Sequence, residues 1–283
     1  MKCIFVSDLH GNKKKIKKLF EIIEKEQPKG VFIGGDILPN TFQIKEDIES
    51  FLREEIFLRI EKIREKTNKK TRFFVILGND DPRVYEKILI EADKNKTIDY
   101  ICEKTVSFND LYVTGYPYVP PTPFQLKDWE KYDVSRFVDV GAASPEEGIR
   151  TIEVEKDFIR YSTISEDLMK LSNNSDMRRT VFLFHSPPYK SNLDRAALDG
   201  KYVDNAPLDV HVGSVAIQRF IDAHQPLLTL HGHVHESYSL TGEWMEKKGK
   251  TISLSAAYNG PELLLIRFDT KDIYNPEMEL IEV

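Results

Sequence analysis

The order of apolar runs and amphipathic stretches in the first hundred residues restricts the fold more than any other feature of the chain. Short β-rich runs at residues 2–6, 31–33 and 72–77 alternate with helical patterns at residues 13–27, 42–66 and 82–92. Strands that alternate with helices indicate a mostly parallel sheet with right-handed crossovers. This half of the chain is therefore expected to be an α/β structure with the order βαβαβα.

The remaining two thirds of the chain are richer in strand-like segments. No repeat, low-complexity linker or composition break divides the 283 residues, so we expect one domain that spans residues 1–283. Strands are expected at residues 98–102, 104–108, 111–115, 180–184, 226–230, 251–255, 263–268 and 278–281, a tight turn at Asn109-Asp110, and helices from Pro145 to about Leu171 and from about Val215 to His224.

Five of the apolar runs end in side chains that can bind a metal ion. In an open α/β sheet, ligands bind outside the carboxyl ends of the strands, so residues that are distant in sequence can meet at one site. Carboxylate, amide and imidazole donors without thiolates suit Mn²⁺ best, with Fe, Zn²⁺ or Ni²⁺ as alternatives. The donors are too many for one ion and predict two cations roughly 3.5–4 Å apart. In chain order they are Asp8 with His10, Asp36, Asn79 with Asp80, His185, and finally His231, His233 and His235.

The last group of histidines has a simpler interpretation, as a surface turn or the remnant of a purification tag. A tag would lie at a terminus without a strand before it, whereas here an apolar run precedes His231. Alternate residues of an extended backbone share a face, so the three imidazoles would project together. His211 and His224 lie away from strand ends, and His224 is expected to be a helix-end partner rather than a ligand.

The five motifs, taken in this order, resemble those of the calcineurin-like metallophosphoesterases. The resemblance covers residues 8–235 and implies a four-layer α/β/β/α sandwich of two mixed sheets flanked by helices. By motif position it also implies that Asp36 bridges two metals and that His231 stands behind the ligands. The matching motifs are Asp8-x-His10, Gly35-Asp36, Gly78-Asn79, His185 and Gly232-His233-x-His235, which would place Asp8, His10 and His235 on one metal and Asn79, His185 and His233 on the other.

One position departs from that pattern. The family commonly has a histidine after the Gly-Asn pair, and here Asp80 stands in its place, followed by Asp81. Beside two cations a carboxylate stays ionised, so Asp80 is a poor general acid and would repel a dianionic phosphate. We therefore predict a phosphodiesterase that cleaves a small or nucleotide-like diester by attack of a metal-bridging hydroxide. Asp36, Asp80 and His233 are the residues expected to act in catalysis.

Two alternatives remain open. A phosphomonoesterase or protein phosphatase would keep the same site and change the substrate. A non-catalytic interaction scaffold of the same fold is also compatible with the loss of the usual histidine. Because every expected metal ligand is present, we favour an enzyme over a scaffold.

Charge, hydropathy and cysteine content limit the partners and the location. A net charge of -6 argues against binding long nucleic acid through a basic surface. No apolar run reaches the ~18 residues of a membrane span, and the start turns polar too soon for a signal peptide, so we expect a cytoplasmic protein without a membrane partner. Cys3 and Cys102 lie in apolar runs and are expected to be buried, reduced thiols.

Two long loops are expected to form the walls of the substrate pocket. The loop at residues 116–133 is rich in aromatic residues and proline, and the loop at residues 189–212 is rich in acidic residues. Loops of this length inside a compact domain are usually functional or disordered. The aromatic rings of the first loop could stack on a substrate or pack against the core. The sequence names neither the substrate nor the oligomeric state.

Overall fold

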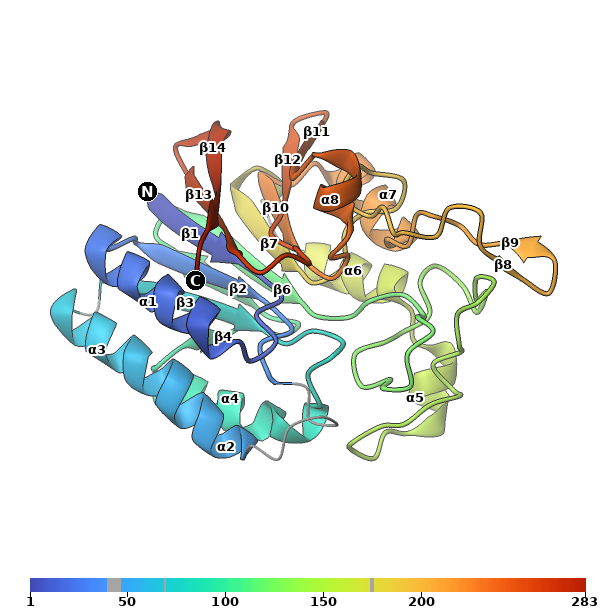
Figure 1. Cartoon of the computed structure of the whole chain (residues 1–283), viewed down its shortest axis with the longest axis horizontal. Helices are drawn as coiled ribbons and strands as arrows, with labels where there is room; N and C mark the ends of the chain where they lie inside the picture. Colours follow the sequence, from blue (N-terminus) through green and yellow to red (C-terminus); the bar gives the residue numbers. More distant parts are fainter. Residues whose placement is uncertain (40–46, 69, 174–175) are drawn as a thin grey trace.

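Two six-stranded sheets packed face to face form the centre of the computed structural model, which describes residues 1–39, 47–68, 70–173 and 176–283 (Figure 1). In spatial order the first sheet contains β14 (Asp272–Ile281), β13 (Leu263–Asp269), β1 (Lys2–Val6), β2 (Gly30–Gly34), β3 (Arg72–Ile76) and β4 (Asp99–Tyr100). The second contains β11 (Met245–Lys248), β12 (Thr251–Ser255), β10 (Leu228–His231), β7 (Thr180–Phe184), β6 (Leu111–Tyr116) and β5 (Thr105–Phe108).

Both sheets are mixed, with parallel strands in the middle. Strands β1 to β4 run parallel, and β13 and β14 are antiparallel additions at one edge. In the second sheet β6, β7, β10 and β12 run parallel, and the edge strands β5 and β11 pair antiparallel. The predicted parallel arrangement of the first three strands is therefore confirmed, and their carboxyl ends meet at one edge.

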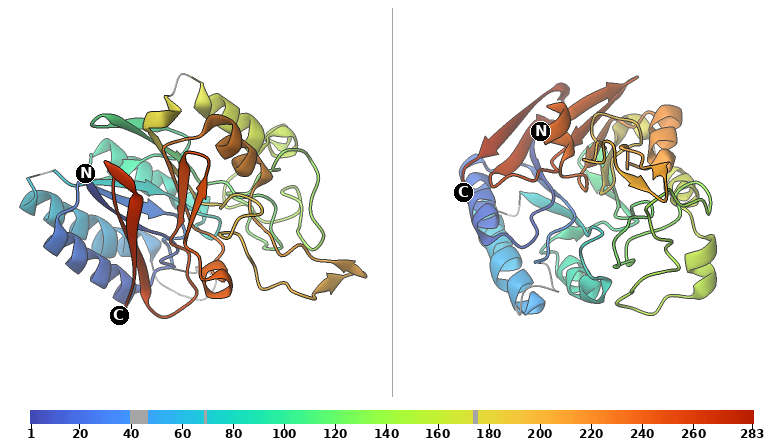
Figure 2. Two further views of the ribbon diagram at one scale, coloured as in Figure 1. Left: turned by 90° about the horizontal axis from the view of Figure 1, so that it is seen from above. Right: turned by 45° about the vertical axis from the view of Figure 1, so that its right-hand side comes forward.

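Alternation along the strands creates four layers. In β1, Cys3 and Phe5 face the second sheet and join an inner core with residues such as Leu230 and Leu254, whereas Ile4 and Val6 face the helices. The predicted four-layer α/β/β/α sandwich is confirmed, and two further views show helices outside the sheets (Figure 2). Outside the first sheet lie α1 (Lys13–Glu26), α2 (Ile48–Phe51), a π-helical turn (Leu52–Phe57), α3 (Leu58–Lys66) and α4 (Glu86–Lys94), and outside the second lie α6 (Ile164–Ser172) and α7 (Val215–His224).

Helix α1 illustrates how local sequence sets these elements. The side chain of Asn12 caps the helix by accepting hydrogen bonds from the backbone N–H groups of Lys14 and Lys15. The helix ends at Glu26, and the next residue, Gln27, adopts a left-handed conformation before Pro28. Its buried stripe consists of Ile16, Leu19, Phe20 and Ile23, and most of its lysines are exposed.

The segment after Pro145 differs from the prediction of one continuous helix. Only α5 (Lys156–Tyr161) and α6 are helical, and residues 145–155 form turns and an extended pairing. The N–H of Ile149 donates to the Gln125 carbonyl at 2.8 Å, and the N–H of Lys127 donates to the Ile149 carbonyl at 2.8 Å. These long-range bonds satisfy the backbone groups that a helix would otherwise pair, and they cannot be read from local periodicity.

The other boundaries agree with the sequence to within a few residues, with some exceptions. Residues 42–46 of the expected helix 42–66 lie outside the described residues, and the helical run begins at Ile48. The expected strand 98–102 is reduced to β4, and β14 begins earlier than expected, at Asp272. A 3-10 turn (Arg83–Tyr85) precedes α4. The sequence did not indicate β8 (Tyr202–Val203), β9 (Ala206–Pro207), β11 or α8 (Ser237–Thr241).

Two expectations from composition can be compared directly with the structure. Cys3 and Cys102 are buried free thiols, as predicted. Within the described residues, no helix combines the length and apolar character needed to cross a membrane.

Candidate metal centre

The loops that follow five parallel strands converge at one edge of the sandwich. The N–H of Asp8 donates to the Gly35 carbonyl at 3.1 Å, which ties the loop after β1 to the loop after β2. The N–H of Gly232 donates to the His185 carbonyl at 2.9 Å and ties the loop after β10 to the end of β7. Nδ1 of His185 lies 2.8 Å from the Gly34 carbonyl and connects the two sheets. The structure therefore gathers all five sequence motifs in one place.

Unusual backbone conformations orient several of these side chains toward the centre. Asp8, His10, Asp36 and His233 have φ angles of 56°, 43°, 50° and 73°, in the left-handed region that non-glycine residues rarely occupy. Each such residue costs on the order of 1–3 kcal/mol and persists only when the surrounding structure enforces it. Strain of this kind at four residues of one site indicates that the protein itself fixes the arrangement of the donors.

Two glycines leave room for the carboxylates. A Cβ atom at Gly78 would lie 2.3 Å from Oδ1 of Asp36, and one at Gly232 would lie 2.7 Å from Oδ2 of Asp8. Both contacts are shorter than any real Cβ contact, so a larger residue would displace the carboxylate. The glycines of the Gly-Asn and Gly-His motifs thus serve the approach of neighbouring loops.

The first group of donors consists of Asp8, His10, Asp36 and His235, whose ligand atoms all lie within 4.8 Å of one another. Nε2 of His235 lies 3.1 Å from Nε2 of His10 and 3.0 Å from Oδ1 of Asp8. Donor atoms that share a cation at about 2.0–2.2 Å lie roughly 3.0–3.5 Å from one another. The spacing and the chemistry of this group therefore fit a divalent cation.

The second group forms around His185. Nδ1 of His185 donates to the Gly34 carbonyl, so its Nε2 is the nitrogen that faces the centre, 3.0 Å from Oδ1 of Asn79 and 3.3 Å from Oδ2 of Asp36. Loss of the Nε2 proton would leave a lone pair for a cation. The ring of His233 lies beside that of His185, with centroids 5.3 Å apart. A backbone acceptor on one imidazole nitrogen and electron-rich atoms facing the other are typical of a metal ligand. These residues could hold a second cation.

Protons balance the charges of the centre when it holds no cation. Burial alone would raise the pKa of Asp8, but the charge and hydrogen bond of His235 outweigh it and hold the pKa at about 2. Burial also opposes ionisation of His185, yet Asp36 raises its pKa to about 10, and Asp8 likewise raises that of His235 to about 9. Burial and the charge of His185 lower the pKa of His233 to about 3. The buried carboxylates thus demand positive charge, which a cation could supply in place of the protons.

A model of the calcineurin-like phosphoesterase family matches residues 1–237, which include every residue of this centre. The chain belongs to this family. The resemblance noted from the sequence motifs is therefore confirmed, and the protein is a metal-dependent phosphoesterase by family.

Solved structures agree with this fold at low sequence identity. One crystal structure is 20% identical and superposes with a TM-score of 0.60 over 99% of each chain. The protein TT1561 of Thermus thermophilus is 12% identical, with a TM-score of 0.55 over 99% of this chain and 98% of that one. A dimetal phosphatase from Danio rerio is 10% identical, with a TM-score of 0.56 over 94% and 91% of the two chains. A search of curated proteins finds no match.

Asp80 occupies the position where the calcineurin-like phosphoesterases commonly have a histidine. Its side chain is 49% exposed, and Oδ2 lies 3.9 Å from Nδ1 of His10. Oδ1 accepts a hydrogen bond from Nδ2 of Asn79 at 2.9 Å, which turns Oδ1 of Asn79 toward His185. In the metal-free site, burial and then the charge of Asp36 raise the pKa of Asp80 to about 6, an effect that two cations would oppose.

The remaining histidines are engaged elsewhere. His231 is fully buried, with Nδ1 2.9 Å from the Ser186 carbonyl and Nε2 2.8 Å from Oγ1 of Thr229. Both of its nitrogens are occupied, and burial lowers its pKa to about 4, which agrees with a neutral group behind the ligands. His224 is the last residue of α7, as expected. Nδ1 of His211 lies 2.7 Å from the buried carboxylate of Asp194, within the loop 189–212.

Most aromatic side chains of residues 116–133 are buried in the protein rather than exposed to a substrate. Tyr116, Tyr118, Trp129 and Tyr132 are all buried, and Tyr118 and Trp129 meet edge to face with ring centroids 5.4 Å apart. Phe124 is the exception, at 53% exposed. Of the two interpretations of these rings, packing against the core is the correct one for the four buried residues.

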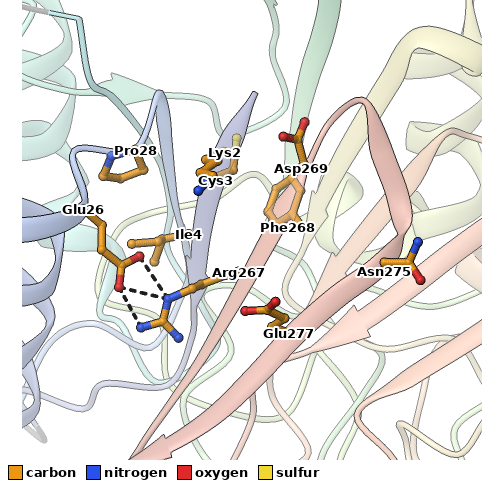
Figure 3. A pocket seen from close by; sticks show the side chains of 10 residues that line it. All are labelled: Lys2, Cys3, Ile4, Glu26, Pro28, Arg267, Phe268, Asp269, Asn275 and Glu277. Atoms are coloured by element: carbon orange, nitrogen blue, oxygen red, sulfur yellow. Dashed lines mark hydrogen bonds and ion pairs between the residues drawn. The ribbon is translucent and has the colours of Figure 1, made fainter.

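A separate cavity of about 180 Å³ lies at the opposite end of β1 (Figure 3). Its wall includes Lys2, at the start of that strand, and Arg267. The guanidinium of Arg267 forms an ion pair with Glu26 at 2.8 Å and with Glu279 at 2.7 Å, so its charge is already balanced. We assign no part of the phosphoesterase chemistry to this cavity.

Proposed function

We propose that the protein is a phosphodiesterase with a dinuclear metal centre, built on a single domain that spans residues 1–283. In this proposal Asp36 bridges the two cations, because its Oδ2 lies 3.3 Å from Nε2 of His185 and 3.9 Å from Nε2 of His10. The proposed ligands of the first cation are Asp8, His10 and His235, and those of the second are Asn79, His185 and His233.

The proposed preference for a diester rests on the negative charge of Asp80. A phosphate monoester brings two negative charges to the mouth of the site, where the half-exposed carboxylate of Asp80 lies beside His10. A diester brings one negative charge and meets correspondingly less repulsion. Asp80 has no imidazole proton to offer a leaving group, so the proposed substrates are small diesters whose leaving groups depart without that help.

The side chains divide the remaining tasks. Asp36 and Asp8 supply buried negative charge, and the backbone N–H of His233 donates to Oδ1 of Asp8 at 3.1 Å and fixes its orientation. The carboxylate of Asp80 accepts a hydrogen bond from Nδ2 of Asn79 and thereby orients the Asn79 amide. Bound divalent cations would neutralise charge on the phosphoryl oxygens and lower the pKa of water toward neutrality. The mixed oxygen and nitrogen donors favour Mn²⁺, which we propose as the resident ion.

The test compares a diester with its matching monoester. Metal-depleted protein would be reloaded with Mn²⁺, Ni²⁺, Fe²⁺ or Mg²⁺, and kcat/KM measured for bis(p-nitrophenyl) phosphate and p-nitrophenyl phosphate. We expect Mn²⁺ to give the highest activity and the diester to be cleaved faster. Faster cleavage of the monoester would exclude the diesterase preference in favour of a phosphomonoesterase.

A substitution at Asp36 tests the assignment of the site. Asp36→Asn removes a charge that both cations would share, so we expect turnover of either substrate to fall to the background level. Unchanged hydrolysis would show that the reaction occurs elsewhere. Absence of hydrolysis in the wild-type protein with all four metals, and with a wider set of nucleotide diesters, would favour the interaction scaffold.

A further inference from the structure

Asp81 follows the Gly-Asn-Asp sequence of the site but contributes no atom to either group of donors. Its side chain is completely buried. Oδ1 accepts a hydrogen bond from the N–H of Leu38 at 2.8 Å, and Oδ2 accepts from the N–H groups of Gly78 at 2.9 Å and Ile37 at 3.2 Å. One carboxylate thus satisfies three backbone donors that belong to two different loops.

These two loops carry the residues on which the second cation depends. Ile37 and Leu38 directly follow Asp36, and Gly78 directly precedes Asn79. A second bond joins the loops in front of Asp81, because the N–H of Asp80 donates to Oδ1 of Asp36 at 2.8 Å. Among the described residues, no backbone–backbone hydrogen bond joins residues 36–38 to residues 78–81. The Asp81 carboxylate therefore supplies the link between the two loops beyond the ends of β2 and β3.

The aromatic segment supports the same turn from the other side. Nε1 of Trp129, which is fully buried, donates to the backbone carbonyl of Asp81 at 2.8 Å. The carboxylate of Asp128 accepts from the N–H of Arg83 at 2.8 Å, and the guanidinium of Arg83 stacks over the Trp129 ring at 4.8 Å. Residues 128–129 therefore fix the backbone of residues 81–83, while the Asp81 side chain reaches forward to the Asp36 loop.

We infer that Asp81 is a positioning residue, which holds the Asp36 and Asn79 loops at the separation required for a cation to bind between Asp36, Asn79 and His185. The inference rests on the proposed function for its kinetic consequence, but not for its effect on metal binding. Partners that orient metal ligands commonly contribute 10- to 100-fold, in order of magnitude, to metal affinity or activity. Asp81 differs from such partners in that it acts through backbone N–H groups of two loops at once.

The test measures metal binding in Asp81→Asn. Asn keeps the volume and one acceptor oxygen but turns an NH₂ group toward a backbone donor, so at least one of the three bonds is lost. Free Mn²⁺ would be followed by electron paramagnetic resonance during a titration of metal-depleted protein. We expect two equivalents to bind the wild type, and the Kd of one of them to rise roughly 10- to 100-fold in the variant. Saturating Mn²⁺ should restore kcat with little change in the KM for the diester.

A half-buried aspartate that also accepts backbone N–H groups provides the control. Asp133 accepts hydrogen bonds from the N–H groups of Val215 at 2.6 Å and Ala216 at 3.2 Å at the start of α7, and it touches neither ligand loop. Asp133→Asn should lower the Tm without changing either Mn²⁺ affinity. If Asp81→Asn behaves in the same way, with a lower Tm and two unchanged affinities, Asp81 is merely structural and the inference is wrong.

The remaining outcomes are also decisive. If Asp81→Asn does not fold, Trp129→Phe replaces it, because the variant keeps a ring and loses the N–H donor to the Asp81 carbonyl. It should raise the weaker Kd by at least about threefold, and an unchanged Kd overturns the inference. A wild-type protein that binds fewer than two Mn²⁺ ions overturns it as well. A wild-type protein that binds two ions but cleaves no phosphoester defeats the proposed function alone.

Discussion

At the scale of single residues, the centre depends on the charge at its mouth. The buried donors are fixed by strained backbone, close-packed glycines and backbone hydrogen bonds, and they leave little freedom for variation. Asp80 is different, because its side chain is half-exposed and no backbone N–H group of the described residues fixes its carboxylate. A substitution here can change the electrostatics of the substrate site while the donors behind it stay in place.

We expect Asp80→Asn to shift the substrate preference toward monoesters. The amide oxygen of Asn can still accept from Asn79, but the negative charge near the phosphate is gone. For a half-exposed charge the effect is on the order of 1 kcal/mol, or roughly fivefold in the ratio of kcat/KM for monoester to that for diester. Asp110→Asn, in the turn between β5 and β6 at the far end of the second sheet, is the control. An unchanged ratio in Asp80→Asn would show that pocket shape rather than charge determines the preference.

At the scale of elements, the long segment between β6 and α5 is held by buried ion pairs rather than by regular structure. Nζ of Lys127 donates to Oε2 of Glu130 at 2.7 Å and to the Thr122 carbonyl at 2.8 Å, and both charged side chains are fully buried. Burial raises the pKa of Glu130 to about 7 even though the Lys127 charge opposes the shift. The segment therefore contains a buried polar cluster whose charges are expensive to remove from water. Each charged side chain stabilises the fold only while its partner is present.

Removing one member of this cluster should destabilise the protein strongly. Lys127→Met leaves the Glu130 carboxyl buried without its partner, and we expect a loss of about 3 kcal/mol in the free energy of unfolding by urea. The exposed pair of Arg53 and Glu49, separated by 3.3 Å on α2 and the π-helical turn, is the comparison. Arg53→Ala should cost less than about 0.5 kcal/mol. Equal effects at both positions would contradict the assigned importance of burial.

The same contrast explains what could be predicted from the sequence. Strand ends rich in Asp and His are local signals, and the fold places those signals together, so the five motifs predicted where these side chains gather. The bonds from Asp81 to the Asp36 loop and the pairing of Ile149 with Gln125 instead join segments that are far apart in the chain. No local pattern encodes such contacts, and an amphipathic pattern after Pro145 was therefore read wrongly as a helix. The only local signal for Asp81 was its place directly after Gly78-Asn79-Asp80.

At the scale of the whole molecule, the centre couples stability to pH. Asp36 and Asp8 raise the pKa values of His185 and His235 to about 10 and about 9 in the metal-free protein, above the unfolded value of 6.5. A raised histidine pKa stabilises the fold in full below pH 6.5, and the contribution disappears as the pH rises through the folded pKa. Metal-free protein therefore loses these interactions on the alkaline side of neutrality.

We expect the Tm of chelator-treated protein to fall between pH 6.5 and pH 9, as measured by scanning fluorimetry. Protein loaded with Mn²⁺ should not show this fall, because the cations replace the protons as counter-charges to the buried carboxylates. The difference in Tm between loaded and metal-free protein should consequently widen as the pH rises. A constant difference across this range would mean that the two histidines are not held by Asp36 and Asp8 in solution.

The bond from His185 to the Gly34 carbonyl crosses from one sheet to the other, and the donors on either side of it come from both sheets. Cations held by these donors would therefore join the two sheets at the edge that carries the centre. Away from that edge, the core between the two sheets consists mostly of apolar contacts, which have no preferred direction. If the two sheets separate slowly, we therefore expect the separation to begin at the edge opposite the metal centre, while the edge that carries the centre stays closed.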